Sequence, residues 1–168
     1  TPNPVKSVWT SAGATLTFDP RVLLAQGTMN TKAIPSSGER LPVIGLGTSG
    51  PFEVGADTSA RAPLAAVLGG FFDAGCTLID TSPMYSTAEG VLGDLLTPAQ
   101  QKRAFIATKV WTRGAEEGIA QMQRSMQLLK RERVDLMQIH NLLDLDVHLA
   151  TLRRWKEEGR IRYIGITH

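Results

Sequence analysis

The sequence predicts an α/β fold built on a parallel sheet, and two observations indicate this class. Short apolar runs alternate with amphipathic stretches between residues 43 and 166, and the centres of these runs recur about every 30 residues, which is typical of right-handed βαβ units. The composition fits a folded domain, because 42% of the 168 residues are hydrophobic and 20% are charged. We therefore expect one domain with a core of its own.

The elements follow in order after a β-hairpin. Turn residues 35–38 separate two short runs, so a hairpin is expected there, and it leads into a strand over residues 43–46. The first helix has cap residues at 57–59 and a stop signal at Gly75. The elements expected after it are a strand at 77–79, a helix from about 87, a strand at 104–108, a helix over 115–130, a strand at 134–139, a helix over 146–159 and a strand at 161–166.

Some local signals have an ordinary structural meaning. Ser86 and Glu89 have the spacing of a capping box, which predicts the start of the second helix near residue 87, and Pro98 limits that helix. Met122 and Met126 fall at helical spacing and are interpreted as core residues rather than as a metal or cofactor site. The single cysteine, Cys76, is interpreted as a small core residue.

Two architectures fit the βαβ alternation. One is a doubly wound sheet and the other is a (β/α) barrel. A complete barrel typically takes about 250 residues and eight units. With five strands after the hairpin, this chain cannot close such a barrel alone.

A polar or ionisable residue closes every predicted strand. In parallel α/β folds the carboxyl ends of the strands lie at the same end of the sheet, where the active or binding site is usually found. Taken singly, each has an ordinary explanation: Asp80 as a turn or cap residue, Tyr85 as a half-buried aromatic, Lys109 as a solvated amine and His140 as a structural histidine. An acid, a phenol, an amine and an imidazole at consecutive strand ends favour a catalytic site. The other polar residues at these ends are Thr48, Ser49, Thr108, Asn141, Thr167 and His168.

The four side chains have complementary chemistry. A tyrosine is a poor acid at neutral pH, but a nearby ammonium such as Lys109 stabilises its phenolate. Asp80 would hold the lysine, and His140 would donate a hydrogen bond to a substrate oxygen. Such a set can polarise and protonate a carbonyl while its carbon is attacked. It has no good nucleophile of its own, so hydride from a nicotinamide cofactor is the expected reactant.

Six short motifs follow one another along this chain in a characteristic order and spacing. They are GLGT at 45–48, IDTSPMY at 79–85, AEGVLG at 88–93, ATKVW at 107–111, DLMQIHN at 135–141 and GRIRYIGITH at 159–168. In this order they resemble the aldo-keto reductase family, and the resemblance covers residues 31 to 168. It implies a parallel (β/α)8 TIM-barrel fold, of which this chain holds the first five strands and an N-terminal hairpin. It also implies an NAD(P)H-dependent oxidoreductase that reduces aldehydes or ketones to alcohols.

The same resemblance assigns roles to individual residues. Asp80 falls on the family's catalytic acid, Tyr85 on its proton donor, Lys109 on its lysine and His140 on its carbonyl-orienting histidine. It favours NADP(H) over NAD(H), a substrate pocket that includes Trp111 and Met84, and no metal. Many members have Ser-Asn after the fifth strand, where this chain has Thr-His. The residues expected to contact the cofactor are Gly47, Thr48, Ser49, Asn141, Thr167 and His168.

The remaining expectations concern partners and location. Formal net charge is +2, with no block of basic residues, so nucleic acid is not expected as a partner. No apolar stretch has the roughly 18 residues that a membrane span needs. A cytoplasmic location is expected, or a periplasmic or secreted one if residues 1–28 derive from a leader. That segment is interpreted as a leader, an extension or an added sequence with poor order, and residues 29–168 as the reductase portion.

Two other functions stay open at this stage. One is a regulatory protein that binds the nicotinamide cofactor on the same scaffold. The other is a barrel enzyme in which Lys109 forms a Schiff base with its substrate. Because five strands leave two unpaired edges, we also expect the isolated chain to be inactive or weakly active, and to be completed by another chain or to self-associate through those edges.

Overall fold

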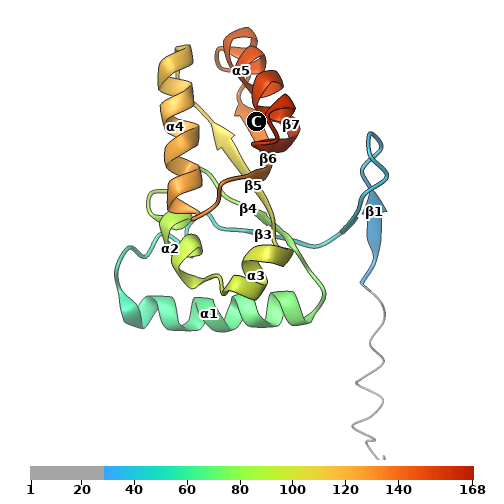
Figure 1. The fold of residues 1–168 in the computed structure, drawn as a ribbon. Helices are drawn as coiled ribbons and strands as arrows, with labels where there is room; N and C mark the ends of the chain where they lie inside the picture. The colour runs from blue at the N-terminus through green and yellow to red at the C-terminus, as the bar shows by residue number, and fades with distance from the viewer. Residues whose placement is uncertain (1–28) are drawn as a thin grey trace, which may run out of the picture.

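The computed structural model describes residues 29–168, and the expectation for residues 1–28 lies outside this part of the chain. The described part of the chain begins with a two-stranded antiparallel hairpin made of β1 (Thr31–Ala33) and β2 (Arg40–Pro42). Figure 1 shows this hairpin standing apart from the helices. Gly38 lies in the connecting turn with a φ of 74°, which glycine adopts without a steric penalty. The predicted hairpin is confirmed.

A five-stranded parallel sheet forms the centre of the molecule, and its strand order follows the chain. Each successive strand pairs with the one before it, as in the wall of a (β/α) barrel. The two outer strands of this sheet pair with a single neighbour within the described residues. The strands are β3 (Gly45–Gly47), β4 (Leu78–Asp80), β5 (Phe105–Val110), β6 (Val134–His140) and β7 (Ile161–Thr167).

Helices connect the strands and begin largely where the cap residues predict. Asp57 caps the first helix by accepting hydrogen bonds from the backbone N–H groups of Ser59 and Ala60, and Gly75 follows its end with a φ of 83°. The α4 and α5 helices lie side by side and contact each other (Figure 1). The helices are α1 (Thr58–Asp73), α2 (Ala88–Leu95), α3 (Pro98–Arg103), α4 (Ala115–Leu128) and α5 (Leu145–Glu157).

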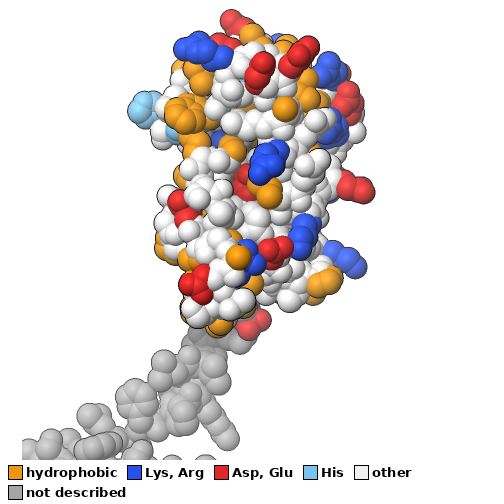
Figure 2. All heavy atoms as spheres, turned by 90° about the vertical axis from the view of Figure 1, so that its left-hand side faces the viewer, with side chains coloured by type: hydrophobic (Ala, Val, Ile, Leu, Met, Phe, Trp, Pro, Cys, Tyr) orange, Lys and Arg blue, Asp and Glu red, His pale blue; other side chains and the backbone are white. Residues whose placement is uncertain are grey.

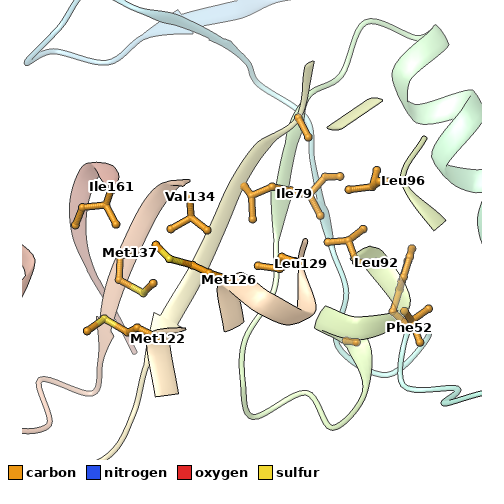
Figure 3. Packing of buried hydrophobic residues seen from close by; sticks show 14 of the residues in the cluster. Phe52, Ile79, Leu92, Leu96, Met122, Met126, Leu129, Val134, Met137 and Ile161 are labelled. Carbon is orange, nitrogen blue, oxygen red and sulfur yellow. The ribbon is translucent and has the colours of Figure 1, made fainter. Parts of the chain in front are cut away.

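The hydrophobic core fills the space between the helices and one face of the sheet. Alternate strand residues such as Ile79, Met137 and Ile139 are fully buried, and they pack with Met122 and Leu129 near α4. Figure 3 shows this packing, in which both predicted core methionines take part. Cys76 is buried at 3% exposure, as expected of a small core residue. On the opposite face, the carboxyl ends of the strands carry polar side chains such as Asp80, Lys109 and Gln138.

Two local predictions are wrong. The strand predicted at 43–46 begins two residues later, and Val43 and Ile44 before it are about half exposed. The capping box of Ser86 and Glu89 does not form, because Glu89 points into the protein and accepts a hydrogen bond from Thr108.

Pro98 does more than limit the second helix. It is the first residue of α3, a separate helix of six residues, and a capping box between Thr97 and Gln100 begins this helix.

The surface of the described residues has no strong charge asymmetry on the face shown in Figure 2, where acidic and basic side chains are interspersed. None of the helices in the described part of the chain is long and apolar enough to cross a membrane. Among the same residues, no group of three or more His, Cys, Asp or Glu side chains is arranged to hold a metal ion.

Candidate active site

Strand register places three of the four predicted catalytic side chains on the face of the sheet opposite the helices. Paired residues in a parallel sheet point to the same side, and so do residues two apart in one strand. Asp80 pairs with Ala107, Lys109 pairs with Gln138, and His140 pairs with Thr167. Asp80, Lys109 and His140 therefore project from one face, near the carboxyl ends of three neighbouring strands.

A partly buried ion pair joins two of these residues. The Lys109 Nζ atom lies 2.7 Å from Asp80 Oδ2, and it donates a second hydrogen bond of 2.9 Å to the Thr81 carbonyl oxygen. The lysine side chain is only 4% exposed, whereas the Asp80 side chain is 39% exposed. The ammonium is therefore shielded from water and fixed by two oxygen atoms, while the carboxylate still faces the open side of the site.

Tyr85 reaches the same ammonium from the loop after β4. Lys109 Nζ lies 4.9 Å from the centroid of the tyrosine ring, within the range of a cation–π contact. The loop is ordered by local hydrogen bonds, since the Tyr85 N–H donates to the Ser82 carbonyl and the Ala88 N–H donates to the Tyr85 carbonyl. The ring is half-buried and packs against the hydrophobic core. The phenol thus lies beside a fixed positive charge.

His140 lies at the end of β6 with an aromatic neighbour. Its ring centroid is 6.0 Å from that of Trp111, and the two planes meet at 75° in an edge-to-face arrangement. His140 Nδ1 is buried and has no hydrogen-bond partner among the described residues. Trp111 is 44% exposed, so this aromatic side chain borders the open side of the site.

Gln138 is a site residue that the sequence interpretation missed. Its Nε2 atom donates a 3.1 Å hydrogen bond to Asp80 Oδ1, so the two oxygens of Asp80 are held by different residues. The signal was present in the sequence, because Gln138 is two residues before His140 in the same strand and must share its face. Gln138 thus orients the carboxylate that holds Lys109.

The predicted cofactor contacts have different surroundings. Thr48 is fully buried, and its hydroxyl donates to the Asp80 carbonyl oxygen at 3.1 Å. Ser49 and Asn141 are exposed, and Asn141 has a φ of 54°, a conformation that asparagine tolerates better than most residues. The Asn141 N–H donates to the carbonyl of Thr167, which joins the ends of β6 and β7. His168 is exposed at the end of the last strand.

Comparison with known proteins decides the family. The aldo/keto reductase family model matches residues 43–168, a span that includes the whole site described above. The chain belongs to the aldo/keto reductase family. The family resemblance predicted from the motifs is confirmed, and so is the α/β fold with a five-stranded parallel sheet and an N-terminal hairpin.

Several characterised members of the aldo/keto reductase family are similar to this chain. A methylglyoxal reductase, YeaE of Escherichia coli (strain K12), is 32% identical over 147 residues, which are 83% of this chain and 50% of that protein. An NADPH-dependent codeinone reductase 1-5 of Papaver somniferum is 30% identical over 130 residues, which are 70% of this chain and 39% of that protein. The chain therefore spans about half the length of the curated relatives it matches.

Solved structures of the family share the fold. The thermostable aldo-keto reductase Tm1743, solved with the inhibitor epalrestat, superposes with a TM-score of 0.72 at 28% identity, over 82% of this chain and 53% of that one. An aldo-keto reductase from Klebsiella pneumoniae in complex with NADPH gives a TM-score of 0.71 at 26% identity, over 83% of this chain and 50% of that one.

The residues of the site fit a nicotinamide group. A Cβ atom added to Gly47, the register partner of Asp80, would meet no atom within 4 Å, so the space beside the carboxylate is open. The exposed Asn141 amide has both a donor and an acceptor, which suit the carboxamide of a nicotinamide ring. The hydroxyl of Thr167 lies at the adjacent strand end.

Proposed function

We propose that this chain provides the proton-donating part of an NAD(P)H-dependent carbonyl reductase that converts aldehydes or ketones to alcohols. The observation that carries the proposal is the position of Lys109, which contacts both the Asp80 carboxylate and the Tyr85 ring at the carboxyl ends of the strands. A reduced nicotinamide, when bound, supplies the hydride for the carbonyl carbon. The chain's own residues bind the substrate oxygen and donate a proton to it.

Each residue has one task in this proposal. The Tyr85 phenol gives its proton to the carbonyl oxygen as the carbon becomes tetrahedral, and the Lys109 ammonium stabilises the phenolate that remains. The Asp80 carboxylate holds the Lys109 ammonium in place. His140 donates a hydrogen bond to the substrate oxygen and so holds the carbonyl toward the phenol. One hydride and one proton are added, and the product is the alcohol.

We propose NADP(H) as the cofactor in preference to NAD(H), and small carbonyl compounds as substrates. The solved relative from Klebsiella pneumoniae binds NADPH, and the codeinone reductases are named as NADPH-dependent. Trp111 lies edge-on to His140, and Met84 lies in the loop that carries Tyr85. These apolar side chains suit the carbon skeleton of an aldehyde. A comparison of kcat/KM with NADPH and with NADH checks the cofactor preference, and equal values would contradict it.

The substitution Tyr85→Phe tests the reaction most directly. In the whole protein, loss of the phenolic proton should lower kcat by roughly 10²- to 10⁴-fold while the Kd for NADPH changes little. Tyr163→Phe is the matched control, because the hydroxyl of Tyr163 binds Ser37 and Glu39 of the hairpin region, away from the site. A Tyr85→Phe enzyme with unchanged kcat would refute the proposed role.

A Schiff base at Lys109 is disfavoured by its contacts. A nucleophilic lysine must be a neutral amine, whereas Nζ here lies against a carboxylate and a carbonyl oxygen, which both stabilise the ammonium. Borohydride added with an aldehyde substrate should therefore trap no covalent adduct on Lys109. Tight NADPH binding without turnover on a broad panel of aldehydes would instead support a regulatory protein.

A further inference from the structure

The loop between β5 and α4, residues 111–114, accepts hydrogen bonds from and donates hydrogen bonds to side chains of α4 and of the start of α5. This loop carries Trp111, the residue that lies edge-on to His140. Three polar side chains from outside the loop bind its backbone atoms. Gln121 belongs to α4, Asp144 precedes α5, and His148 belongs to α5. We refer to these three residues as the loop clamp.

Gln121 binds the backbone of Trp111 through both ends of its amide. Its Oε1 atom accepts a 2.7 Å hydrogen bond from the Trp111 N–H, and its Nε2 atom donates to the Trp111 carbonyl oxygen at 3.3 Å. The side-chain amide of Gln121 thus bonds to the Trp111 N–H and C=O as the backbone of a neighbouring β-strand would. It fixes the peptide groups on both sides of the Trp111 Cα atom, and therefore the direction in which the indole leaves the backbone.

Asp144 and His148 fix the rest of the loop. Asp144 Oδ2 accepts a 2.8 Å hydrogen bond from the Gly114 N–H, and its other oxygen lies 3.3 Å from the Arg113 guanidinium. The His148 Nε2 atom lies 2.8 Å from the Thr112 carbonyl oxygen. Because a carbonyl oxygen only accepts, this nitrogen carries the proton and donates. The clamp thus holds four backbone atoms of a four-residue loop.

The packing around His148 shows that its position is built into the fold. The side chain is fully buried between α4 and α5, where Gly118 faces it. A Cβ atom on Gly118 would lie 2.5 Å from His148 Cε1, so any larger residue would push the imidazole away from the loop. The α4 helix can therefore approach α5 only because this residue is glycine. None of the clamp residues belongs to the set proposed for proton transfer.

We propose that Gln121, Asp144 and His148 are positioning residues that hold Trp111 beside His140 and thereby set which carbonyl substrates the site accepts. This inference rests on carbonyl reduction as the function of the site. A fixed indole, 44% exposed beside the residue that orients the carbonyl, forms a rigid wall against which a flat aromatic substrate can pack. A small aliphatic aldehyde has little surface to place there and depends less on the wall.

Gln121→Met tests the clamp with a side chain of similar length that cannot hold the Trp111 backbone. Gln123→Met is the control, because Gln123 is an exposed residue of the same helix and undergoes the same chemical change. In the whole protein with NADPH, Gln121→Met should lower kcat/KM for benzaldehyde relative to propanal by about fivefold or more, mainly through the KM for benzaldehyde. Gln121→Glu keeps the acceptor for the Trp111 N–H and should give an intermediate ratio.

A second readout needs neither cofactor nor turnover. The indole N–H resonance of Trp111, identified by its loss in Trp111→Phe, should shift and broaden in Gln121→Met and stay in place in Gln123→Met. An unmoved resonance or an unchanged benzaldehyde-to-propanal ratio in Gln121→Met would overturn the inference. If the unsubstituted protein reduces neither aldehyde, carbonyl reduction is refuted, and the resonance alone then decides whether the clamp holds Trp111.

Discussion

The Lys109 ammonium lies 2.7 Å from the Asp80 carboxylate, with the lysine side chain almost completely buried and the aspartate side chain 39% exposed. This asymmetry is characteristic of a pair that serves a site. The cation is held inside the protein, where its field is little screened, while the anion stays partly open to solvent. Gln138 holds the second oxygen of Asp80, so the carboxylate cannot rotate away from the lysine.

Replacement of Asp80 by asparagine should therefore weaken both the chemistry and the fold. The amide keeps the shape of the side chain but leaves Lys109 buried without its counter-charge, so kcat should fall by about 10- to 100-fold and the free energy of unfolding by about 1–3 kcal/mol. Steady-state kinetics and urea denaturation measure the two effects. Asp94→Asn is the control, because Asp94 pairs with Arg61 and Lys130 on the surface, and equal losses in both variants would contradict the special role of Asp80.

Glu89 should make the stability of the fold depend on pH. Burial raises the pKa of this carboxyl above its usual value of 4.5, and the hydrogen bond from Thr108 opposes the rise only in part. A carboxyl whose pKa is raised on folding contributes its full stability below pH 4.5 and loses it as pH rises through the folded-state pKa. Glu89→Gln, which keeps an acceptor for Thr108, should increase the free energy of unfolding at pH 8 by more than about 0.5 kcal/mol.

The gain from Glu89→Gln should shrink as the pH falls toward 4, and urea denaturation at several pH values measures it. Glu116→Gln is the control, since Glu116 is an exposed residue in the first turn of α4. A gain that is the same at pH 4 and pH 8 would show that the effect does not come from the titration of Glu89.

The hairpin should detach more readily when its ion pair to the sheet is removed. Glu39 binds Arg162 and Tyr163 at the start of β7, and these hydrogen bonds lower the pKa of Glu39 below 4.5. The stabilisation is therefore present above pH 4.5 and is lost as pH falls through the folded-state pKa. Glu39→Gln should reduce amide exchange protection in residues 31–42 at pH 7, and this effect should shrink as the pH falls below 4.5.

The exposed Glu132→Gln serves as the control for the hairpin experiment, because it removes the same charge from another part of the surface. Equal loss of protection in the two variants, or an effect of Glu39→Gln that is independent of pH, would show that the Glu39 ion pair does not tether the hairpin.

The five-stranded sheet should be insufficient for efficient catalysis. A closed barrel of this type has eight strands, and β3 and β7 each pair with one neighbour in the part of the chain that the structure describes. The 168-residue chain tested alone should reduce benzaldehyde at least about 100-fold more slowly than the whole protein. Equal turnover would show that the five strands hold the cofactor without further strands. Analytical ultracentrifugation of the same sample would show whether it self-associates through these edges.

Much of the site could be predicted because side-chain direction follows from local periodicity. The alternation of buried strands and amphipathic helices defines parallel βαβ units, and the end of each strand is visible where the apolar run stops. The parallel arrangement then brings Asp80, Lys109 and His140 to one edge of the sheet. Three of the four residues of the proposed proton transfer can therefore be placed together from strand order alone.

Predictions failed where a residue's partner lies far away in the sequence. Glu89 has the spacing of a helix cap but binds Thr108, 19 residues later on a neighbouring strand. The strand at Gly45–Gly47 is poor in strand-forming residues, yet β3 must approach β4 so closely that a Cβ on Gly45 would lie 2.9 Å from Leu78 Cδ2. The residues next to Gly45 in the sequence cannot predict this close approach of the two strands.

The sequence by itself determined the order of the strands and of the longer helices, the strand-end residues and the family, because each of these depends on residue type and spacing along the chain. Tertiary structure alone decided which partners those residues take. The contact of Gln138 with Asp80 spans 58 residues, and that of His148 with Thr112 spans 36. Both depend on how α4, α5 and the sheet pack together, and side-chain hydrogen bonds form only where that packing brings donor and acceptor within about 3 Å.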